Sequence, residues 1–253
     1  INEEIYYKKF SDEIINGKIF TYRGPDSNKV YLGNLRYGKH EGKWMKFVDT
    51  GNPVTLHEMN YKNGELHGKY IMYNKDGQKS YECSYKNGLE HGTSISYFKG
   101  NKGYVSNYVN GVQHGSTFEY YENGNWSECF ISQGKLDGEC IEYFENGKIY
   151  TLENYKNDNL DGDFFEYFEN GNVKTKINFK FDTYLLVIGK VISYYEDGKI
   201  HCEEDHKDGK LIEVYGKCFE YDENGDILKE HITLNTGRME PLDGEVIKTI
   251  EYK

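Results

Sequence analysis

The sequence predicts an all-β protein, an elongated single-layer antiparallel sheet of tandem β-hairpins. A glycine opens the same short phrase ten times, at intervals of 23 to 28 residues, and a sustained period of this length indicates a repeat architecture. The third residue after each glycine is apolar and the fifth is usually tyrosine, as expected for alternate positions on one face of a strand. The anchor glycines are Gly17, Gly42, Gly68, Gly92, Gly115, Gly138, Gly162, Gly189, Gly216 and Gly244.

Each repeat is predicted to contain two strands and two turns, as residues 68–88 illustrate. The strand that opens at Gly68 runs into Asp76-Gly77, and the returning strand ends at Asn87-Gly88. Such residues tolerate the positive φ of tight hairpin turns. We call these the first and second turn of a repeat. Residues 17–253 form the predicted array, and residues 1–16 are expected to add a leading strand or cap.

The last three repeats carry second turns that are three residues longer. The two ends of this turn are four residues apart at Gly64–Gly68, but seven apart at Asp182–Gly189, Gly209–Gly216 and Gly237–Gly244. Residues 189–253 therefore form a group of units with lengthened turns within the array. The added apolar residues, such as Leu185 and Leu211, are expected either to cover the end of the sheet or to meet a partner.

Composition excludes several classes of function. The net charge is -11 and Lys and Arg form no cluster, which argues against nucleic acid and anionic lipid as partners. The longest apolar run, Tyr184–Ile188, is far shorter than the ~20 residues of a membrane-spanning helix, so we expect no integral membrane contact. The five cysteines are an odd number and do not follow the repeat, so we expect free thiols rather than a disulfide framework.

The phrases Asn60-Tyr61-Lys62-Asn63-Gly64-Glu65-Leu66-His67-Gly68 and Tyr143-Phe144-Glu145-Asn146-Gly147-Lys148 resemble the MORN repeat, in its bacterial variant. The resemblance extends from about Gly17 to Lys253, as about ten tandem copies. It implies a curved sheet of hairpins that serves as a scaffold contacting protein or lipid, and some relatives carry an antitoxin or lipid-kinase label. The chain departs from the family pattern at Asn101, Asp158 and Asp182, where turn glycines are missing.

Enzymatic function is not expected. The chain lacks a phosphate-binding G-x-x-x-x-G-K-[ST] loop, a kinase glycine loop and an H-R-D triplet. His67, His91, His114, Asp137 and Asp161 share one repeat position, but successive members lie two strands, or roughly 10 Å, apart. That spacing is too wide for one metal ion, so we expect them to hydrogen-bond backbone at turns.

A second candidate metal site is the segment His201–His206. As a strand it would place His201, Glu203 and Asp205 on one face and Cys202, Glu204 and His206 on the other. A solvated charged strand explains the segment equally well, and we expect neither a metal nor another cofactor. A metal-dependent enzyme using this segment remains the weakest of three functional interpretations.

Two columns of side chains define the candidate binding surface. Exposed contiguous aromatic rings commonly mark protein interfaces, although the rings could equally fill the inside of a tightly curled sheet. The acidic column begins near residue 119 and should lie on the opposite face, where it would attract a basic partner. The aromatic column is Tyr73, Tyr97, Tyr120, Tyr143, Tyr167 and Tyr194, and the acidic column is Glu119, Glu142 and Glu166.

The sequence therefore predicts a non-enzymatic scaffold that binds a protein or extended peptide along a concave aromatic face. The alternative is an antitoxin or inhibitor that masks a basic toxin. An end-to-end homodimer is compatible with the open ends of such a sheet. The first residue is Ile1 rather than Met, so we expect that an upstream segment has been removed, and the location is either cytoplasmic or exported after removal of an upstream leader.

Overall fold

The structure is a computed structural model that describes residues 13–23, 28–48, 55–181, 185–187, 189–206, 214–235 and 245–252. Every regular element in these ranges is a β-strand and none is a helix, which confirms the all-β prediction. Across the same ranges no helix has the length and apolar character that crossing a bilayer requires. Most of the expected leading segment 1–16 and of the three lengthened turns lies outside the described residues.

The chain folds as two compact units, Ile1–Glu119 and Tyr120–Lys253. The strands of the first unit are β1 (Gly17–Arg23), β2 (Asn28–Arg36), β3 (Lys39–Val48), β4 (Thr55–Lys62), β5 (Glu65–Tyr73), β6 (Lys79–Lys86), β7 (Leu89–Glu90), β8 (Gly92–Phe98), β9 (Asn101–Val109), β10 (Val112–Gln113) and β11 (Gly115–Tyr120), whose last residue begins the second unit. The strands of the second unit are β12 (Trp126–Ser132), β13 (Lys135–Tyr143), β14 (Ile149–Lys156), β15 (Asn159–Leu160), β16 (Gly162–Tyr167), β17 (Val173–Phe181), β18 (Leu185–Val187), β19 (Gly189–Tyr194), β20 (Ile200–His206), β21 (Val214–Tyr221), β22 (Ile227–Asn235) and β23 (Glu245–Glu251).

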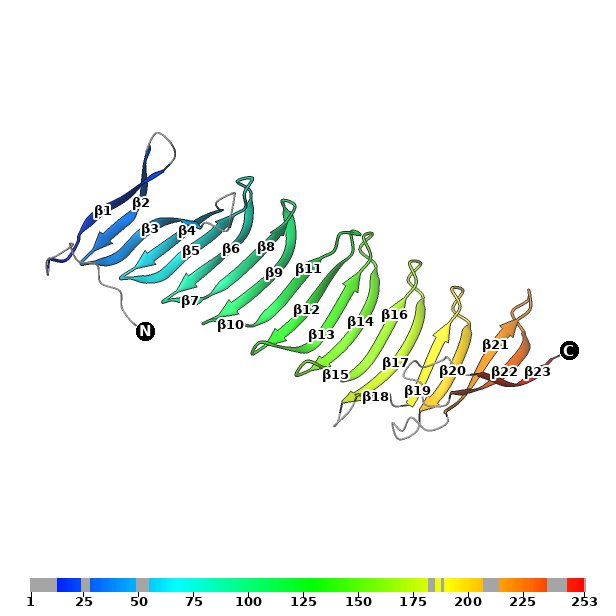
Figure 1. Cartoon of the computed structure of the whole chain (residues 1–253). Coiled ribbons are helices and arrows are strands. Elements are labelled where there is room, and N and C mark those ends of the chain that lie inside the picture. Colours follow the sequence, from blue (N-terminus) through cyan, green and yellow to red (C-terminus); the bar gives the residue numbers. More distant parts are fainter. Residues whose placement is uncertain are drawn as a thin grey trace. The chain divides into compact units, whose positions relative to one another are not determined.

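Within each unit the strands form a single antiparallel layer (Figure 1). Each strand pairs with its neighbours along the chain, as β5 does with β4 and β6, and β13 with β12 and β14. Only short, local connections are needed for this meander. The sequence period is therefore the period of the hairpins.

The two kinds of turn differ in geometry. In the second turns both central residues have positive φ, as at Asn87 (53°) and Gly88 (78°), which is the type I′ geometry that matches the twist of a hairpin. The first turns are longer, and their glycine alone takes positive φ. In the first turn after β13, the Asn146 side chain accepts a hydrogen bond from Lys148 N, which fixes the loop locally.

Consecutive second turns are hydrogen-bonded to one another through the backbone. Gly88 N donates to Leu66 O at 2.8 Å, Gly111 N to Glu90 O at 2.7 Å, and Asp158 N to Leu136 O at 2.9 Å. Each bond joins the turn of one repeat to that of the repeat before it. In the first unit the second turns at Gly64, Gly88 and Gly111 thus form a hydrogen-bonded edge, and the described part of the second unit has the same bond at Asp158.

Of the expected departures from the turn pattern, the one at Asn101 needs correction and the one at Asp158 is confirmed. No glycine is missing beside Asn101: the first turn there is shortened to Lys99-Gly100, with φ of 49° and 83°, and Asn101 already belongs to β9. At Asp158 the aspartate itself adopts φ of 68°, a conformation that Asp tolerates better than most residues. Asp182 lies outside the described residues.

Three anchor glycines, Gly68, Gly115 and Gly162, stand where the side chain of a return-strand asparagine crosses the backbone. The amide of Asn154 donates to Asp163 O at 2.8 Å, and a Cβ on Gly162 would lie 3.1 Å from the Asn154 Cβ. Asn60 and Asn107 make the same bond, to Lys69 O and Ser116 O. Gly162 has a φ of 127°. This positive φ and the close approach together explain why a glycine is needed at this position.

The expectation of free thiols is wrong for four of the five cysteines. Cys129 is bonded to Cys140 and Cys202 to Cys218, with Cα–Cα distances of 4.0 Å in both pairs. Each pair consists of directly opposed residues on adjacent strands. The register of neighbouring strands therefore brings each pair of cysteines together. No sequence motif marks the pairs, and they do not occur in every repeat. Cys83 is free and buried.

The two faces of the sheet are unequally buried. The face that carries the second residue after each anchor glycine, here called the buried face, holds a row of opposed side chains in the first unit: Trp44, Met59, Tyr70 and Cys83. Trp44, Met59 and Leu35 form the apolar core of this unit. Ser94 and Ser106 continue the buried face, and their hydroxyl groups are 2.9 Å apart. Small hydroxyl side chains can be buried here because they satisfy each other.

Replacing Gly147 by valine should lower the free energy of unfolding by about 1 kcal/mol or more. Gly147 has φ of 80° and open space where a Cβ would stand, so the cost is that of the backbone conformation. Gly100→Val should cost a similar amount, whereas Asn101→Val, in a strand, should cost less. Chemical denaturation of the three variants measures this. Equal effects at Gly100 and Asn101 would contradict the shortened turn.

Candidate functional site

The face opposite the buried face carries the third and fifth residues after each anchor glycine, and we call it the ladder face. In the first unit the register aligns Ile71 on β5, Glu82 on β6 and Ile95 on β8 across the sheet. Val105 and Phe118 extend this row. On the other side of Ile71 the row continues to Glu58 and Met45, so the pattern is an apolar row interrupted by two carboxylates.

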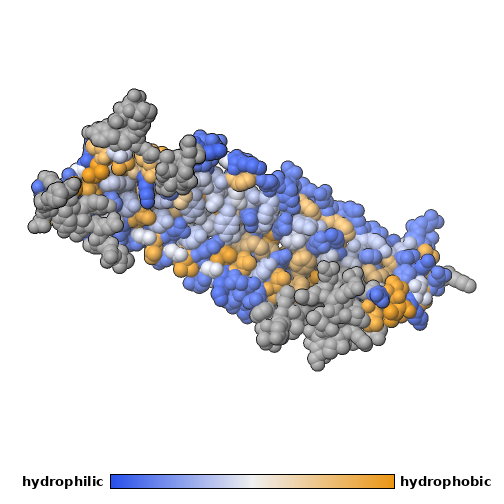
Figure 2. Space-filling model, in the orientation of Figure 1, coloured by the Kyte–Doolittle hydropathy of each residue, from blue (hydrophilic) through white to orange (hydrophobic). Residues whose placement is uncertain are grey.

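The tyrosines of the ladder are partly exposed rather than core. Tyr73, Tyr97, Tyr143, Tyr167 and Tyr194 are half-buried and Tyr120 is 42% exposed. Tyr97 belongs to the first unit, and Tyr143 and Tyr167 belong to the second. The rings therefore present apolar surface on the ladder face, while the most deeply buried side chains lie on the other face. Apolar and hydrophilic surface alternate on the side seen in Figure 2.

A groove in the ladder face of the first unit surrounds Glu82. Lys69, Ile71, Glu82, Ser84, Thr93 and Ile95 line it. The hydroxyl group of Tyr97 donates to Glu82 Oε1 at 2.5 Å, and Lys79 Nζ lies 2.7 Å from Glu82 Oε2. The hydrogen bonds from Lys79 and Tyr97 hold the pKa of Glu82 below its usual value. Glu82 is thus an anchored carboxylate between two isoleucines.

The ladder face of the second unit has an apolar row that lies between Glu128 and Lys176. Ile141, Leu152 and Phe165 oppose one another on β13, β14 and β16, and we call these three the apolar row. Beside it, the rings of Trp126 and Tyr143 stack with centroids 4.0 Å apart. Lys176 Nζ lies 5.2 Å from the centroid of Phe165, which gives this row one cationic neighbour.

Sequence reasoning did not single out Glu82, Trp126 or the return-strand residues between the tyrosines. A sequence signal existed for Trp126, which lies two residues after the first-turn glycine Gly124. At this position it is the cross-strand partner of Tyr143 on β13. Glu82 required the register of β5, β6 and β8, which the repeat period alone does not provide.

The acidic residues Glu119, Glu142 and Glu166 alternate with the ladder tyrosines, so they lie on the opposite face. They are not equivalent. Glu119 is exposed, Glu142 accepts a hydrogen bond from Asn125 at 3.3 Å, and Glu166 is paired with Lys174 at 2.7 Å. Part of this acidic column is therefore neutralised within the protein.

The histidine column contributes to the contacts between repeats. His67 Nδ1 accepts from Asn87 N at 3.5 Å, His91 Nδ1 from Asn110 N at 3.4 Å, and Glu41 from Asn63 N at 2.9 Å at the equivalent position. These side chains thus accept hydrogen bonds from backbone N–H groups in turns, as expected, but each turn belongs to the next repeat. His114, Asp137 and Asp161 continue the column in sequence.

The segment His201–His206 has the faces predicted for it. Cys202, Glu204 and His206 are buried, and His201 and Asp205 are exposed. Cys202 is consumed by its disulfide, and Glu204 Oε2 lies 3.0 Å from His206 Nε2. In the part of the chain that the structure describes, no three His, Cys, Asp or Glu side chains gather as a metal site. That the protein holds no transition metal stays a prediction.

Comparisons with known proteins concern the repeats. Residues 66–87, 136–157, 160–181 and 188–208 match the family described as "MORN repeat variant". No curated protein matches the chain. Among solved structures, a porin-like protein from Bacteroides uniformis is similar over 81% of this chain and 91% of its own, at 9% identity. Its TM-score is 0.21, and no argument rests on this likeness.

The pH dependence of stability should reveal the anchored state of Glu82. Because the pKa of Glu82 is lowered in the folded protein, its contribution to stability is present above the usual glutamate pKa of 4.5 and is lost as the pH falls below that value. The melting temperature of the wild type should therefore fall further between pH 7 and pH 3 than that of Glu82→Gln. Glu65→Gln, an exposed glutamate of the same unit, is the control. Parallel falls in Glu82→Gln and wild type would show that the anchor contributes nothing.

Proposed function

We propose, from the premise that this chain is a MORN repeat protein, that it is a non-enzymatic scaffold binding an extended peptide segment of another protein along its ladder face. The observation that supports this most directly is the apolar row of the second unit. Ile141, Leu152 and Phe165 are in register and only half-buried. An uncovered row of this kind marks an interaction surface.

The geometry suits an extended ligand. The row crosses three strands, and neighbouring strands are about 4.8 Å apart, so a ligand that contacts all three residues must run across the strands. Trp126 and Tyr143 beside the row provide stacked aromatic area, which is typical of residues that dominate binding energy.

Charge favours a basic partner. The chain has a net charge of -11, and an acidic field raises the rate at which a basic ligand is met. In the first unit Glu82 lies within the groove itself. Lys79 already pairs with it, so the acidic charge is expected to steer the ligand more than to hold it.

Truncation of Tyr143 and Tyr167 to alanine should increase the dissociation rate of a bound peptide about tenfold or more, since aromatic anchors act mainly on dissociation. The probe is a peptide selected from a displayed random library against the immobilised full chain, and surface plasmon resonance measures both rates. Tyr37→Ala is the control, because Tyr37 is 69% exposed in a second turn away from the ladder face. Unchanged dissociation in folded Tyr143→Ala and Tyr167→Ala protein would exclude the ladder face.

Reversal of Glu119, Glu142 and Glu166 to lysine should chiefly slow association, and the loss should shrink as salt is added. These carboxylates lie on the other face and need not contact a peptide in the ladder face. Stopped-flow association at 50 and 500 mM NaCl makes the comparison. If the glutamates proved decisive for dissociation while the tyrosines were neutral, the partner would occupy the buried-face side instead.

A further inference from the structure

Both disulfides join one repeat to the next. Cys129 lies on β12 and Cys140 on β13, whereas Cys202 lies on β20 and Cys218 on β21. In each pair the first cysteine is on a return strand, and the second is two residues after an anchor glycine, Gly138 or Gly216. Both pairs belong to the unit Tyr120–Lys253. The first unit contains only the free Cys83.

The bonds replace packing that other junctions make without covalent help. In the first unit the same opposed position holds Met59 against Tyr70 and Ser106 against Thr117, as the register of β9 and β11 implies. Repeats contact only their neighbours, so the stability of an array depends on each junction in turn. A covalent bond across a junction fixes that local contact in a way that packing does not.

The junction of Cys202 and Cys218 has an unfavourable neighbour. Glu204, two residues from Cys202 on the same face, is 2% exposed, and its Oε1 has no hydrogen-bond partner among the described residues. A Cβ on Gly216 would lie 2.7 Å from Glu204 Cγ, so the glycine makes room for this carboxylate. Burying an unsatisfied carboxylate oxygen costs free energy, which the disulfide can offset.

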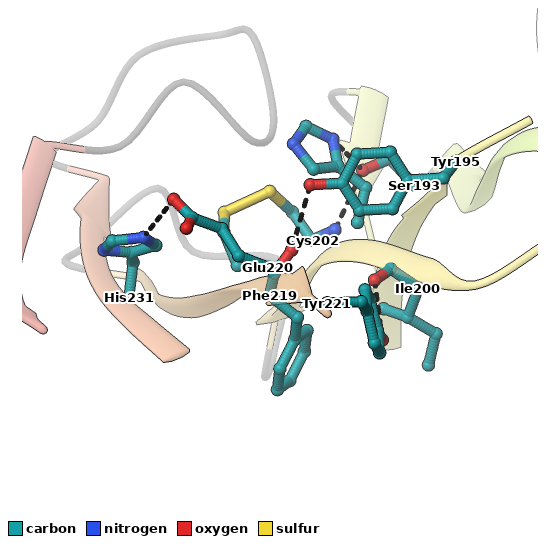
Figure 3. Close-up of a disulfide and its surroundings, with 10 residues drawn as sticks. Ser193, Tyr195, Ile200, Cys202, Phe219, Glu220, Tyr221 and His231 are labelled. Atoms are coloured by element: carbon teal, nitrogen blue, oxygen red, sulfur yellow. Dashed lines mark hydrogen bonds and ion pairs between the residues drawn. A yellow bond between two sulfur atoms is a disulfide. The ribbon is translucent and has the colours of Figure 1, made fainter. Parts of the chain in front are cut away.

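Hydrogen bonds surround this disulfide (Figure 3). Cys202 N donates to Ser193 Oγ at 3.1 Å, and His231, opposite Cys218, lies 3.0 Å from Glu220. Tyr195 and Tyr221 donate their hydroxyl groups to Phe219 O and Ile200 O. These contacts connect residues of four strands, β19 to β22, around the disulfide.

We propose that Cys129–Cys140 and Cys202–Cys218 are redox-responsive clips that make the integrity of the second unit, but not of the first, depend on an oxidising environment. In the reducing step a thiolate of a small dithiol attacks one cysteine sulfur and forms a mixed disulfide. The other cysteine sulfur leaves with the electron pair and takes a proton. The second thiol then displaces the first cysteine, giving two protein thiols and a cyclic disulfide. A disulfide-bearing oxidant reverses the sequence.

The free cysteine is suited to stay out of this exchange. Cys83 is 4% exposed, and burial is the main cause that raises its pKa to about 12, so little thiolate is present at neutral pH. Cys129, Cys140 and Cys218 are half-buried, whereas Cys202 is 5% exposed. Because exchange requires access to a sulfur atom, Cys129–Cys140 can be attacked at either cysteine, whereas attack on Cys202–Cys218 should occur at Cys218.

The test uses the full chain purified without reductant. Alkylation with iodoacetamide under denaturing conditions, followed by mass spectrometry, should modify one cysteine before reduction and five after it. Hydrogen exchange of the native chain is then measured with and without dithiothreitol. Amides of β13, β20 and β21 should exchange at least tenfold faster after reduction, while those of β5, β6 and β8 keep their rates.

Variants separate the clips from a general effect of reductant. Cys129→Ser with Cys140→Ser, and Cys202→Ser with Cys218→Ser, should each exchange as the reduced chain does at its own junction. Cys83→Ser should respond to dithiothreitol like the wild type. Ser94→Cys, opposite Cys83 by the register of β6 and β8, should bring redox-dependent exchange to the first unit. Five modified cysteines before reduction, or equal acceleration in both units of the wild type, would overturn the proposal.

Discussion

A sheet of one layer has no second layer to cover either face, so each row of side chains must be covered by its own neighbours or remain in water. This constraint explains the unequal faces. On the buried face Trp44, Met59 and Leu35 pack together, and Ser94 and Ser106 satisfy each other. On the ladder face the aromatic rings stay half-buried. The surface left over is the one available to a partner.

The proposed binding surface and the most deeply buried side chains therefore lie on different faces of the same strands. Cys140, on the buried face of β13, forms the disulfide, and its neighbour Ile141, on the ladder face, belongs to the apolar row. Because alternate residues point to opposite faces, the two can change independently. A loosened junction at Cys140 would nevertheless shift the strand that carries Ile141, so the redox state of the clip and the shape of the ladder face are coupled through the backbone.

Sequence reasoning predicted the hairpin period, the alternation of the two faces and the placement of Glu142 and Tyr143 on opposite faces of the sheet. These features depend on neighbouring residues in one strand. It did not predict what depends on register between strands. The register shifts between Glu142 and Tyr143, so that Tyr143 opposes Ile149 rather than Tyr150. The pairing of Cys202 with Cys218 and the placement of Glu82 between two isoleucines require that information. The prediction of a missing turn glycine at Asn101 was wrong for a related reason. A loop, here Lys99-Gly100, can shorten without changing the strands that it joins.

The two edges of the array differ in what they allow. At the second turns, backbone bonds such as Gly88 N to Leu66 O tie each turn to its predecessor, whereas neighbouring first turns are joined by side chains, such as Lys148 to Glu169 O. The first turn at Lys99-Gly100 is already shorter than the others. New loops, epitopes or enzymes should therefore be graftable at the first-turn edge, whereas the tight second turns that are bonded to their predecessors, such as those at Gly64 and Gly88, should reject insertions.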